Sequence, residues 1–261
     1  MNGRAPRADR SLGQHWLVDE NILRVIERLA ELSAGDAVLE VGAGPGILTA
    51  YLADRVRHVH AIELDRRLEA ALRQRLAARA NVDVVIGDAM KLDLAGLDPP
   101  PAKLVANLPY SIASPLIVES LEVLPSVQLW CVMVQREVAD RLFASPSTPA
   151  YGAVSVLVQL AAERTGFHPV SPNVFRPRPR VESALVAFRR IVPQLSPGAL
   201  KRTVQAGFAH RRKTLVNSLA LAGVASREAA ASALESLGYP PDVRAEALEP
   251  TDFVRLAGVL R

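Results

Sequence analysis

Short apolar runs alternate with segments of helical periodicity over most of the chain, and this alternation restricts the possible folds more than any other feature. Strands are predicted at 37–41, 59–63, 82–86, 104–106, 127–134 and 184–188. Helices are predicted between them at 19–33, 47–54, 66–78 and 115–124. Such alternation is typical of β-α-β units, whose parallel sheet is covered by helices on both faces. We therefore predict an α/β domain.

The pattern changes after Ile191, where a proline-containing, linker-like segment leads into a region with helical spacing only. Helices are predicted there at 199–209, 214–222, 227–237 and 251–260. We expect two domains, a large α/β domain over 1–190 and a small all-helical domain over 191–261. Residues 1–17 form a basic arm of the first domain, with arginines at Arg4, Arg7 and Arg10.

Charge and cysteine content limit the classes of protein that fit. The 261 residues include 31 Lys and Arg against 27 Asp and Glu, giving a net charge of +4 and a pI near 9.6, which favours a polyanionic partner. The single cysteine, Cys131, stands in an apolar run and is expected to be a small buried side chain, as in a reducing compartment. We find no signal peptide and no membrane span, and expect a cytoplasmic monomer.

A glycine-rich loop, Glu40-Val-Gly-Ala-Gly-Pro-Gly46, follows the first strand of the predicted sheet and precedes a helix. Glycines at Gly42 and Gly44 would let the backbone turn tightly and approach a ligand closely, although any strand-to-helix turn can contain them. Two acidic residues strengthen the case for a ligand. Glu63 ends the second strand, where a carboxylate can accept hydrogen bonds from both ribose hydroxyls, and Asp88 follows the third strand, within reach of an adenine edge.

The spacing of the glycines distinguishes between ligands that contain adenosine. A dinucleotide fingerprint would need a third glycine at position 47, which is Ile47, and a Walker loop would need Gly-Lys-Ser/Thr. The pattern E-x-G-x-G-x-G instead favours S-adenosylmethionine, whose methionyl part needs close backbone contact. A nucleotide-dependent oxidoreductase is the alternative enzyme class, and Ile47 argues against it.

The tetrapeptide Asn107-Leu-Pro-Tyr110 follows the fourth strand and so also falls at the carboxyl edge of the sheet. An exocyclic adenine amine is a poor nucleophile because its lone pair is delocalised into the ring. The Asn107 side-chain oxygen and the Leu108 carbonyl could accept its N–H groups and localise that lone pair. Pro109 would hold the backbone, and Tyr110 offers a face on which the base can stack.

No cysteine nucleophile or histidine base is needed for transfer of a sulfonium methyl group, because alignment of nitrogen, carbon and sulfur is the main requirement. The five histidines show no metal-ligand spacing within one element, and no metal is assigned. They are His15, His58, His60, His168 and His210.

Nine segments, taken in order along the chain, make it resemble the small-subunit ribosomal RNA adenine N6-dimethyltransferase family. These segments are Gly13-Gln-His-Trp-Leu17, 40–46, Ile62-Glu-Leu-Asp65, Gly87-Asp-Ala-Met90, 107–110, Gln135-Arg-Glu-Val138, Ala150-Tyr-Gly-Ala-Val-Ser155, 175–183 (Phe-x-Pro-x-Pro-x-Val-x-Ser) and 208–219 (Phe-x-x-Arg-Arg-Lys-Thr-Leu-x-Asn-Ser-Leu). One departure is that the family usually has Asn and Phe where this chain has His15 and Trp16.

The resemblance implies a Rossmann-like class I methyltransferase with a seven-stranded, mostly parallel sheet and a helical C-terminal domain. It implies S-adenosylmethionine-dependent transfer of two methyl groups to each of two adjacent adenines in the 3′-terminal hairpin of 16S rRNA, within the 30S ribosomal subunit or its precursor. By matching positions, Phe175 would face Tyr110 across the target base. The residues implied to touch the cofactor are His15, Leu17, Gly42, Gly44, Glu63, Asp88 and Asn107.

Two groups of basic residues are candidates for RNA contact. Arg176, Arg178 and Arg180 alternate with prolines, so that an extended backbone could spread them along the rim of the site. Arg211, Arg212 and Lys213 precede a helix of the second domain. Basic runs are often only solvated faces, but a polyanionic substrate favours phosphate contact here.

Two further alternatives remain at this stage. A related branch of the family methylates an adenine of large-subunit rRNA, and the segment 211–219 resembles the small-subunit enzymes instead. A non-catalytic ribosome-assembly factor could keep the same fold, and the intact segment 107–110 argues against a purely non-catalytic role.

Overall fold

A computed structural model describes residues 8–9, 14–191, 198–210 and 212–260. The chain forms two compact units: residues 1–139 with 163–190, and residues 140–162 with 191–261. The chain passes between the units near residue 190, where the sequence suggests a domain boundary. The sequence gives no sign of the additional passage at 140–162. Arg4, Arg7, Arg10, Gly13 and the linker 192–197 lie outside the described residues.

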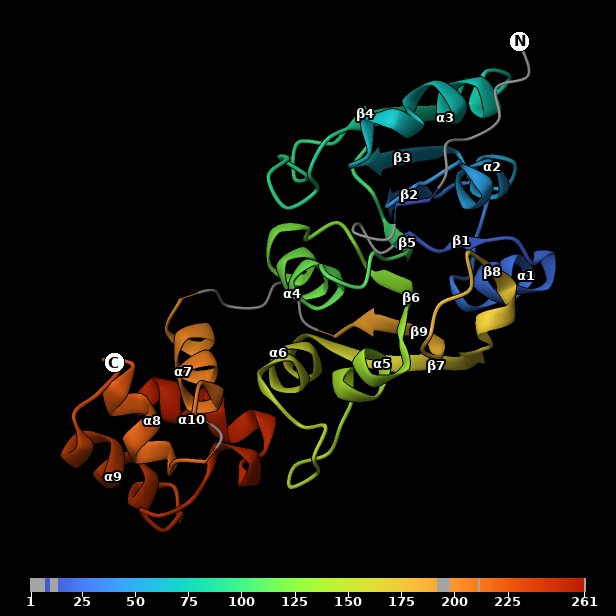
Figure 1. Ribbon diagram of the computed structural model, residues 1–261. Coiled ribbons are helices and arrows are strands. Elements are labelled where there is room, and N and C mark those ends of the chain that lie inside the picture. Colours follow the sequence, from blue (N-terminus) through green and yellow to red (C-terminus); the bar gives the residue numbers. More distant parts are fainter. Residues whose placement is uncertain (1–7, 10–13, 192–197, 211, 261) are drawn as a thin grey trace. The chain divides into compact units, whose positions relative to one another are not determined.

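The first unit is built on a seven-stranded sheet (Figure 1). In spatial order its strands are β4 (Val82–Ile86), β3 (His58–Glu63), β2 (Ala37–Val41), β5 (Lys103–Asn107), β6 (Leu129–Gln135), β9 (Ser183–Arg190) and β7 (Ala162–Val170). The pairs from β4 to β6 are parallel, whereas β9 is antiparallel to β6. This mostly parallel sheet of seven strands is the predicted fold class.

Helices cover both faces of this sheet. Successive strand residues point to opposite faces, and in β6 both sets of side chains are buried, so each face packs against helices. On β6, Cys131 is buried against α1 (Glu20–Leu29), where its thiol lies 3.9 Å from the Ile26 carbonyl oxygen. The next side chain back, Trp130, donates from Nε1 to Ser120 Oγ of α4 (Ala113–Val123) on the other face. The helices α2 (Ile47–Ala53) and α3 (Glu69–Leu76) share the apolar core of the α1 face. Figure 1 shows α1 and α2 on the side of the sheet opposite α4.

A small two-stranded sheet forms at one side of the first unit. In it, β1 (Trp16–Leu17) pairs antiparallel with β8 (Phe175–Arg176), with Trp16 opposite Arg176 and Leu17 opposite Phe175. The sequence does not predict these strands, because two residues are too few for a periodic pattern. We call residues 14–17 the N-terminal strap. The pairing brings the strap beside the segment that follows it by almost 160 residues.

Several further elements of the structure differ from the sequence prediction. The strand β7 was not predicted, because Glu163, Arg164, Gly166 and Pro169 interrupt its apolar pattern. It is the last strand in the order of the sheet, a position where such residues are tolerated. The structure also has α5 (Arg136–Leu142) and α6 (Ala153–Ala161), together with short 3-10 turns at Arg66–Leu68, Pro172–Val174 and Ala245–Ala247.

The second unit packs its helices around aromatic side chains. Its helices besides α6 are α7 (Ala199–Phe208), α8 (Leu215–Leu221), α9 (Arg227–Ser236) and α10 (Pro250–Val259), close to the four predicted segments. Phe208 contacts both Tyr151 and Phe253, with ring centroids 5.8 Å and 5.7 Å apart. The buried hydroxyl of Tyr151 donates to the Leu248 carbonyl, which satisfies its polar end.

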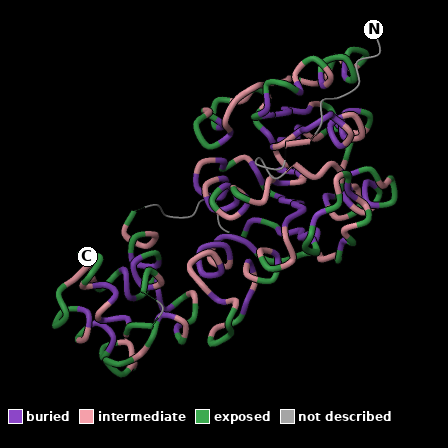
Figure 2. Tube along the Cα trace, in the orientation of Figure 1, coloured by how far each residue is buried: buried purple, intermediate pink, exposed green. Residues whose placement is uncertain are grey.

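Figure 2 shows buried residues along the strands of the sheet and along the inner faces of the helices in each unit. Among the described residues, no helix is both long enough and apolar enough to span a lipid bilayer.

Candidate active site

The strand order reverses between β2 and β5, since β3 and β4 extend the sheet on one side and β5 and β6 on the other. In open parallel sheets, ligands bind at the carboxyl ends of the strands at such a switch point. A cavity of about 210 Å³ lies there, lined by the ends of β2, β3 and β5. Gln14, His15 and Trp16 of the N-terminal strap also line it.

The glycine-rich loop packs directly on the segment after β5. Gly42 has φ +82°, and a Cβ there would lie 3.0 Å from Pro109 Cδ. Gly44 has φ +57°, and a Cβ would lie 3.3 Å from Trp16 Cδ1 of the strap. Both positions therefore need glycine for two reasons, a left-handed backbone and a lack of space.

Glu63, at the end of β3, holds the glycine loop in place. Its carboxylate accepts hydrogen bonds from the Gly44 N–H at 2.7 Å and from the Asp65 N–H at 2.8 Å. Burial raises the pKa of Glu63, and these two N–H groups act in the opposite direction. Each carboxylate oxygen has more than one lone pair, so Glu63 keeps the capacity to accept ribose hydroxyls. Asp88 also lines the cavity and accepts from the Met90 N–H at 3.0 Å.

Glu40, the next-to-last residue of β2 and the first of the glycine-rich segment 40–46, is only 1% exposed. Burial is the main cause that raises its pKa to about 8, and the nearby Glu63 carboxylate adds to the effect. Ionisation of Glu40 in the folded state therefore costs free energy. A carboxyl whose folded pKa exceeds its unfolded pKa stabilises the fold fully below the unfolded value of 4.5 and loses that contribution as pH rises toward 8.

We therefore predict that Glu40→Gln increases stability at alkaline pH. At pH 5 the variant and the parent protein should unfold at similar urea concentrations. At pH 8 the variant should be more stable, by about 3 kcal/mol, because Gln carries no charge to bury. Urea unfolding at the two pH values measures the difference, and a stability gain that shrinks as pH rises would contradict the prediction.

Asn107 ends β5 and presents its amide to the cavity. Its Nδ2 donates to the His15 backbone carbonyl at 2.9 Å. A carbonyl only accepts hydrogen bonds, so this contact fixes which end of the amide is nitrogen and leaves the Oδ1 acceptor on the other side. The adjacent Leu108 N–H donates to the Met133 carbonyl at 3.0 Å, which ties this backbone to β6.

Two contacts fix the side chain of Tyr110, one made by its hydroxyl and one by its ring. Its hydroxyl lies 2.8 Å from Ser183 Oγ at the start of β9, and burial raises its pKa. Its ring stacks on the His15 imidazole, with centroids 5.8 Å apart and planes 29° from parallel. His15 Nδ1 is itself 2.8 Å from the Pro177 carbonyl oxygen, so it donates there.

The strap is anchored at its start by Gln14, whose Nε2 donates to Asp65 Oδ2 at 2.9 Å. Hydrogen bonds from Arg67 and then from Gln14 lower the pKa of Asp65 to about 2. The indole Nε1 of Trp16 is buried, with no hydrogen-bond partner in the described part of the chain. Since Trp16 lines the cavity, this N–H is a donor that a bound ligand can satisfy.

Most of the predicted site residues therefore meet in one cavity. Those that line it are His15, Gly42, Gly44, Glu63, Asp88, Asn107, Leu108, Pro109 and Tyr110. Leu17 and Phe175 do not, because they are 4% and 0% exposed and belong to the apolar core. Phe175 was expected to face Tyr110 across a base; in the structure the ring that stacks on Tyr110 is His15.

The predicted RNA-contact residues are exposed where the structure describes them. Arg176, Arg178 and Arg180 point outward while Pro179 between them is buried. Arg212 and Lys213 are exposed just before α8 in the second unit. Arg211 lies outside the described residues.

Three functional side chains escaped the sequence reasoning as individual residues. Gln14 and Ser183 stand inside segments that carry the family resemblance, but no spacing rule shows that they bond Asp65 and Tyr110. Trp16 was noted only as a departure from the usual Phe. The signal that could have found it is its indole N–H, because a donor in place of an apolar ring needs an acceptor when buried.

This strand order, with an antiparallel β9 beside β6 and a cavity at the switch point, is Rossmann-like, and the solved structures that superpose on it are methyltransferases. A solved dimethyladenosine transferase from Plasmodium falciparum superposes with a TM-score of 0.78 at 25% identity, covering 93% of this chain and 96% of the other. The solved 23S rRNA methyltransferase ErmE superposes with a TM-score of 0.63 at 29% identity, covering 94% and 99%.

Sequence comparison gives the family. The profile described as "Ribosomal RNA adenine dimethylase" matches residues 6–259, and the chain belongs to this family. It is 47% identical over 258 residues to Ribosomal RNA small subunit methyltransferase A of Rubrobacter xylanophilus, covering 98% of this chain and 96% of the relative. It is 45% identical to the protein of the same name from Kineococcus radiotolerans, covering 96% and 85%.

Proposed function

We propose that this chain transfers methyl groups from S-adenosylmethionine to N6 of two adjacent adenines in the 3′-terminal hairpin of 16S rRNA, in the small ribosomal subunit or its precursor. The observation that carries the proposal is the placement of Asn107. Its amide lines the cavity, and the bond to His15 leaves its acceptor oxygen available. Asn107 lies beside the glycine-rich loop because Pro109, two residues later, packs on Gly42. An amide acceptor is what an adenine amine requires.

The residues of the cavity fit the cofactor. Gly42 and Gly44 let the loop pack closely on Pro109 and Trp16, which also line the cavity, and the unpartnered Trp16 N–H supplies a donor. We infer that Glu63 accepts from the ribose hydroxyls, that Asp88 meets the adenine edge, and that the glycine loop borders the methionyl part. When bound, the cofactor supplies an electrophilic methyl group on a sulfonium sulfur. His15 lines the same cavity, where its backbone carbonyl accepts from Asn107 and its ring stacks on Tyr110.

The chain's own contribution to the chemistry is positioning and polarisation of the target amine. Asn107 Oδ1 and the Leu108 carbonyl accept its two N–H bonds and favour a pyramidal nitrogen with a localised lone pair. Pro109 has no N–H to compete for these acceptors and fixes its own φ. Tyr110 stacks on the base, with its hydroxyl anchored on Ser183.

Support for a small-subunit substrate comes from the relatives that share almost the full length of the chain at 47% and 45% identity, both named for that subunit. The large-subunit enzyme ErmE shares the fold at lower identity, 29%, and remains the second candidate. We further propose that the chain acts as a cytoplasmic monomer, in which the first unit carries the chemistry and the second unit, residues 140–162 with 191–261, contributes to RNA binding.

The decisive experiment incubates the protein with labelled S-adenosylmethionine and with unmethylated small or large ribosomal subunits. We expect label only in the small subunit, in two adjacent adenines of the 3′-terminal hairpin, as mapped by primer extension. Label in large-subunit RNA would assign the chain to the second candidate function. An absence of label in both would favour a role in assembly without catalysis.

The basic residues before α8 give a separate prediction about RNA affinity. Arg211→Ala combined with Arg212→Ala should weaken RNA binding and reduce the slope of log K against log salt by about 1 to 2, because two phosphate contacts would be lost. Cofactor affinity should not change. Filter binding at several salt concentrations measures the slope.

A matched control removes the same charge elsewhere in the second unit. Arg227 and Arg244 are both exposed, and Arg227→Ala with Arg244→Ala should leave the salt slope closer to that of the parent protein. Equal slopes for the two double variants would show that only net charge matters.

A further inference from the structure

Two histidines and an aspartate gather at the end of the sheet opposite the cavity. His58 and His60 stand two residues apart on β3, so their side chains lie on the same face. Asp83 of β4 is the register partner of His60. Glu63, at the other end of β3, is five residues from His58, or about 16 Å along the strand. The cluster is therefore separate from the methyltransferase site.

The hydrogen bond of His60 determines which ring nitrogen is free. Its Nε2 lies 2.8 Å from the Pro99 carbonyl oxygen, so Nε2 carries the proton and donates. In the neutral ring with its proton on Nε2, the lone pair of Nδ1 faces Asp83 Oδ2 at 3.9 Å, so that two acceptors face each other. A cation placed between them would remove this conflict.

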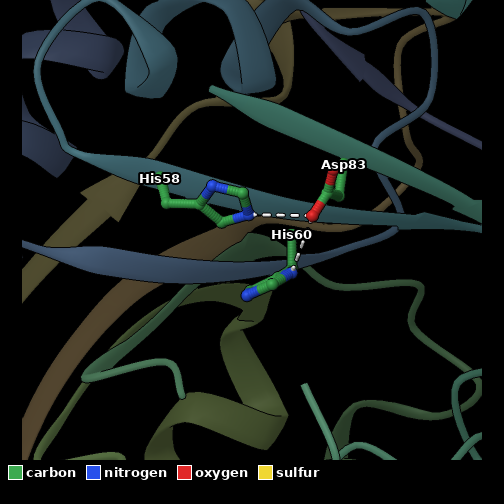
Figure 3. Close-up of side chains that lie close together, drawn as sticks. All are labelled: His58, His60 and Asp83. Atoms are coloured by element: carbon green, nitrogen blue, oxygen red, sulfur yellow. Dashed lines mark hydrogen bonds and ion pairs between the residues drawn. The ribbon is translucent and has the colours of Figure 1, made fainter. Parts of the chain in front are cut away.

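Figure 3 shows the Asp83 carboxylate turned toward both imidazole rings. His58 Nε2 donates a hydrogen bond to Asp83 Oδ2 at 3.1 Å, so a bound ion displaces this proton, and the three candidate ligand atoms all lie within 4.8 Å of one another. Two ligands bound at about 2.1 Å to a tetrahedral zinc ion are about 3.4 Å apart. The separations of 3.1 Å and 3.9 Å fall on either side of that value.

We propose that His58, His60 and Asp83 form a binding site for a divalent transition-metal ion of the zinc class. Nε2 of His58, Nδ1 of His60 and a carboxylate oxygen of Asp83 are the ligands, and water completes the coordination because the Asp83 side chain is 61% exposed. The bond from His60 Nε2 to Pro99 is the outer contact that orients a metal-bound imidazole. The ion links β3, β4 and the loop that precedes β5.

The donor set selects the class of ion. Two imidazole nitrogens suit zinc, nickel, copper or cobalt, whereas magnesium and calcium prefer sites made entirely of oxygen ligands. A single carboxylate between two neutral rings is a poor magnesium site. The side chains of His60 and His58 are only 2% and 16% exposed, which keeps both rings ordered before the ion arrives.

The test is a calorimetric titration of the full-length, metal-free protein with zinc chloride, repeated with magnesium chloride. We expect one zinc ion per chain, no magnesium binding, and a rise in Tm on the order of 5 °C at a zinc concentration a hundred times Kd. Cobalt chloride should give the visible absorption of a tetrahedral nitrogen-oxygen site. A parent protein that takes up no zinc, or takes up magnesium equally well, overturns the proposal.

Single substitutions separate this site from other zinc-binding groups. His58→Gln and Asp83→Asn change side chains that are not deeply buried, so both variants should fold and should lose the bound zinc and the rise in Tm. His168→Gln, which changes a half-buried histidine on β7, should keep both. Zinc uptake by His58→Gln and Asp83→Asn equal to that of the parent protein would place the ion elsewhere and refute the site.

Discussion

Asn107→Ala is expected to reduce the rate of methyl transfer by a factor of about 100 to 1,000 while changing cofactor affinity only slightly. Loss of one preorganised polar group at a reacting centre typically has an effect of this size. The amide lines the cavity, and its Nδ2 is already bonded to the His15 carbonyl, so Oδ1 is the group left for the substrate. Alanine removes that acceptor.

Single-turnover measurements with labelled cofactor give the rate, and calorimetry gives the cofactor Kd. A fall in kcat together with kcat/KM, at nearly constant cofactor Kd, is the signature of an interaction made in the transition state. Equal turnover in the two proteins would mean that the amine is activated by other groups.

Two further variants test how Asn107 acts. Asn107→Asp keeps acceptor oxygens but cannot donate to the His15 carbonyl, so it should recover only part of the rate. Tyr110→Phe keeps the stacking ring and removes the hydroxyl that contacts Ser183, and is expected to lower the rate by less than about tenfold. The contacts therefore predict that the rate of methyl transfer falls in this order: parent protein, Tyr110→Phe, Asn107→Asp, Asn107→Ala.

The parallel sheet explains why much of this site could be predicted from sequence. The strand predictions at 37–41 and 82–86 agree with β2 and β4 at both ends, and the prediction at 59–63 agrees with β3 within one residue. Once consecutive strands are parallel, their carboxyl ends meet at one edge. Gly42, Glu63, Asp88 and Asn107 each follow or end a strand, so they had to come together.

Contacts between segments far apart in the chain could not be predicted in this way. Asn107 bonds the carbonyl of His15, 92 residues earlier, and Tyr110 bonds Ser183, 73 residues later. Local periodicity carries no information about such pairs. The backbone pairing of β1 with β8 is equally nonlocal, and each strand has only two residues to reveal it.

The cluster of His58, His60 and Asp83 shows a second reason why part of the structure could not be predicted from the sequence. No two histidines have metal-ligand spacing within one predicted element, so the sequence pattern assigns them no metal. Two histidines at i and i+2 share a face only if the segment is a strand, as His58 and His60 do on β3. The third residue, Asp83, comes from a neighbouring strand through the β3–β4 register, which the sequence pattern does not determine.

Phe175→Ala is expected to lower the free energy of unfolding by about 3 to 5 kcal/mol, because it removes a large side chain from a packed core. The ring is 0% exposed, and its neighbour across β1 and β8 is Leu17, itself 4% exposed. Both belong to the same apolar cluster as α1 and the sheet. The side chain therefore supports the strap that carries His15 and Trp16.

Phe175→Ala and Phe175→Leu together distinguish two roles for Phe175: a side chain of the apolar core, or a surface on which the target base stacks. Phe175→Leu fills most of the volume without an aromatic face, so as a core residue it should lose about 1 kcal/mol and keep most of the methylation rate. Urea unfolding gives the stabilities, and KM for the RNA substrate gives the second readout. If Phe175 stacks on the base, both variants instead raise that KM severalfold and Phe175→Ala leaves stability nearly unchanged. Because the ring is enclosed by Leu17 and the core, we expect the loss of stability to dominate.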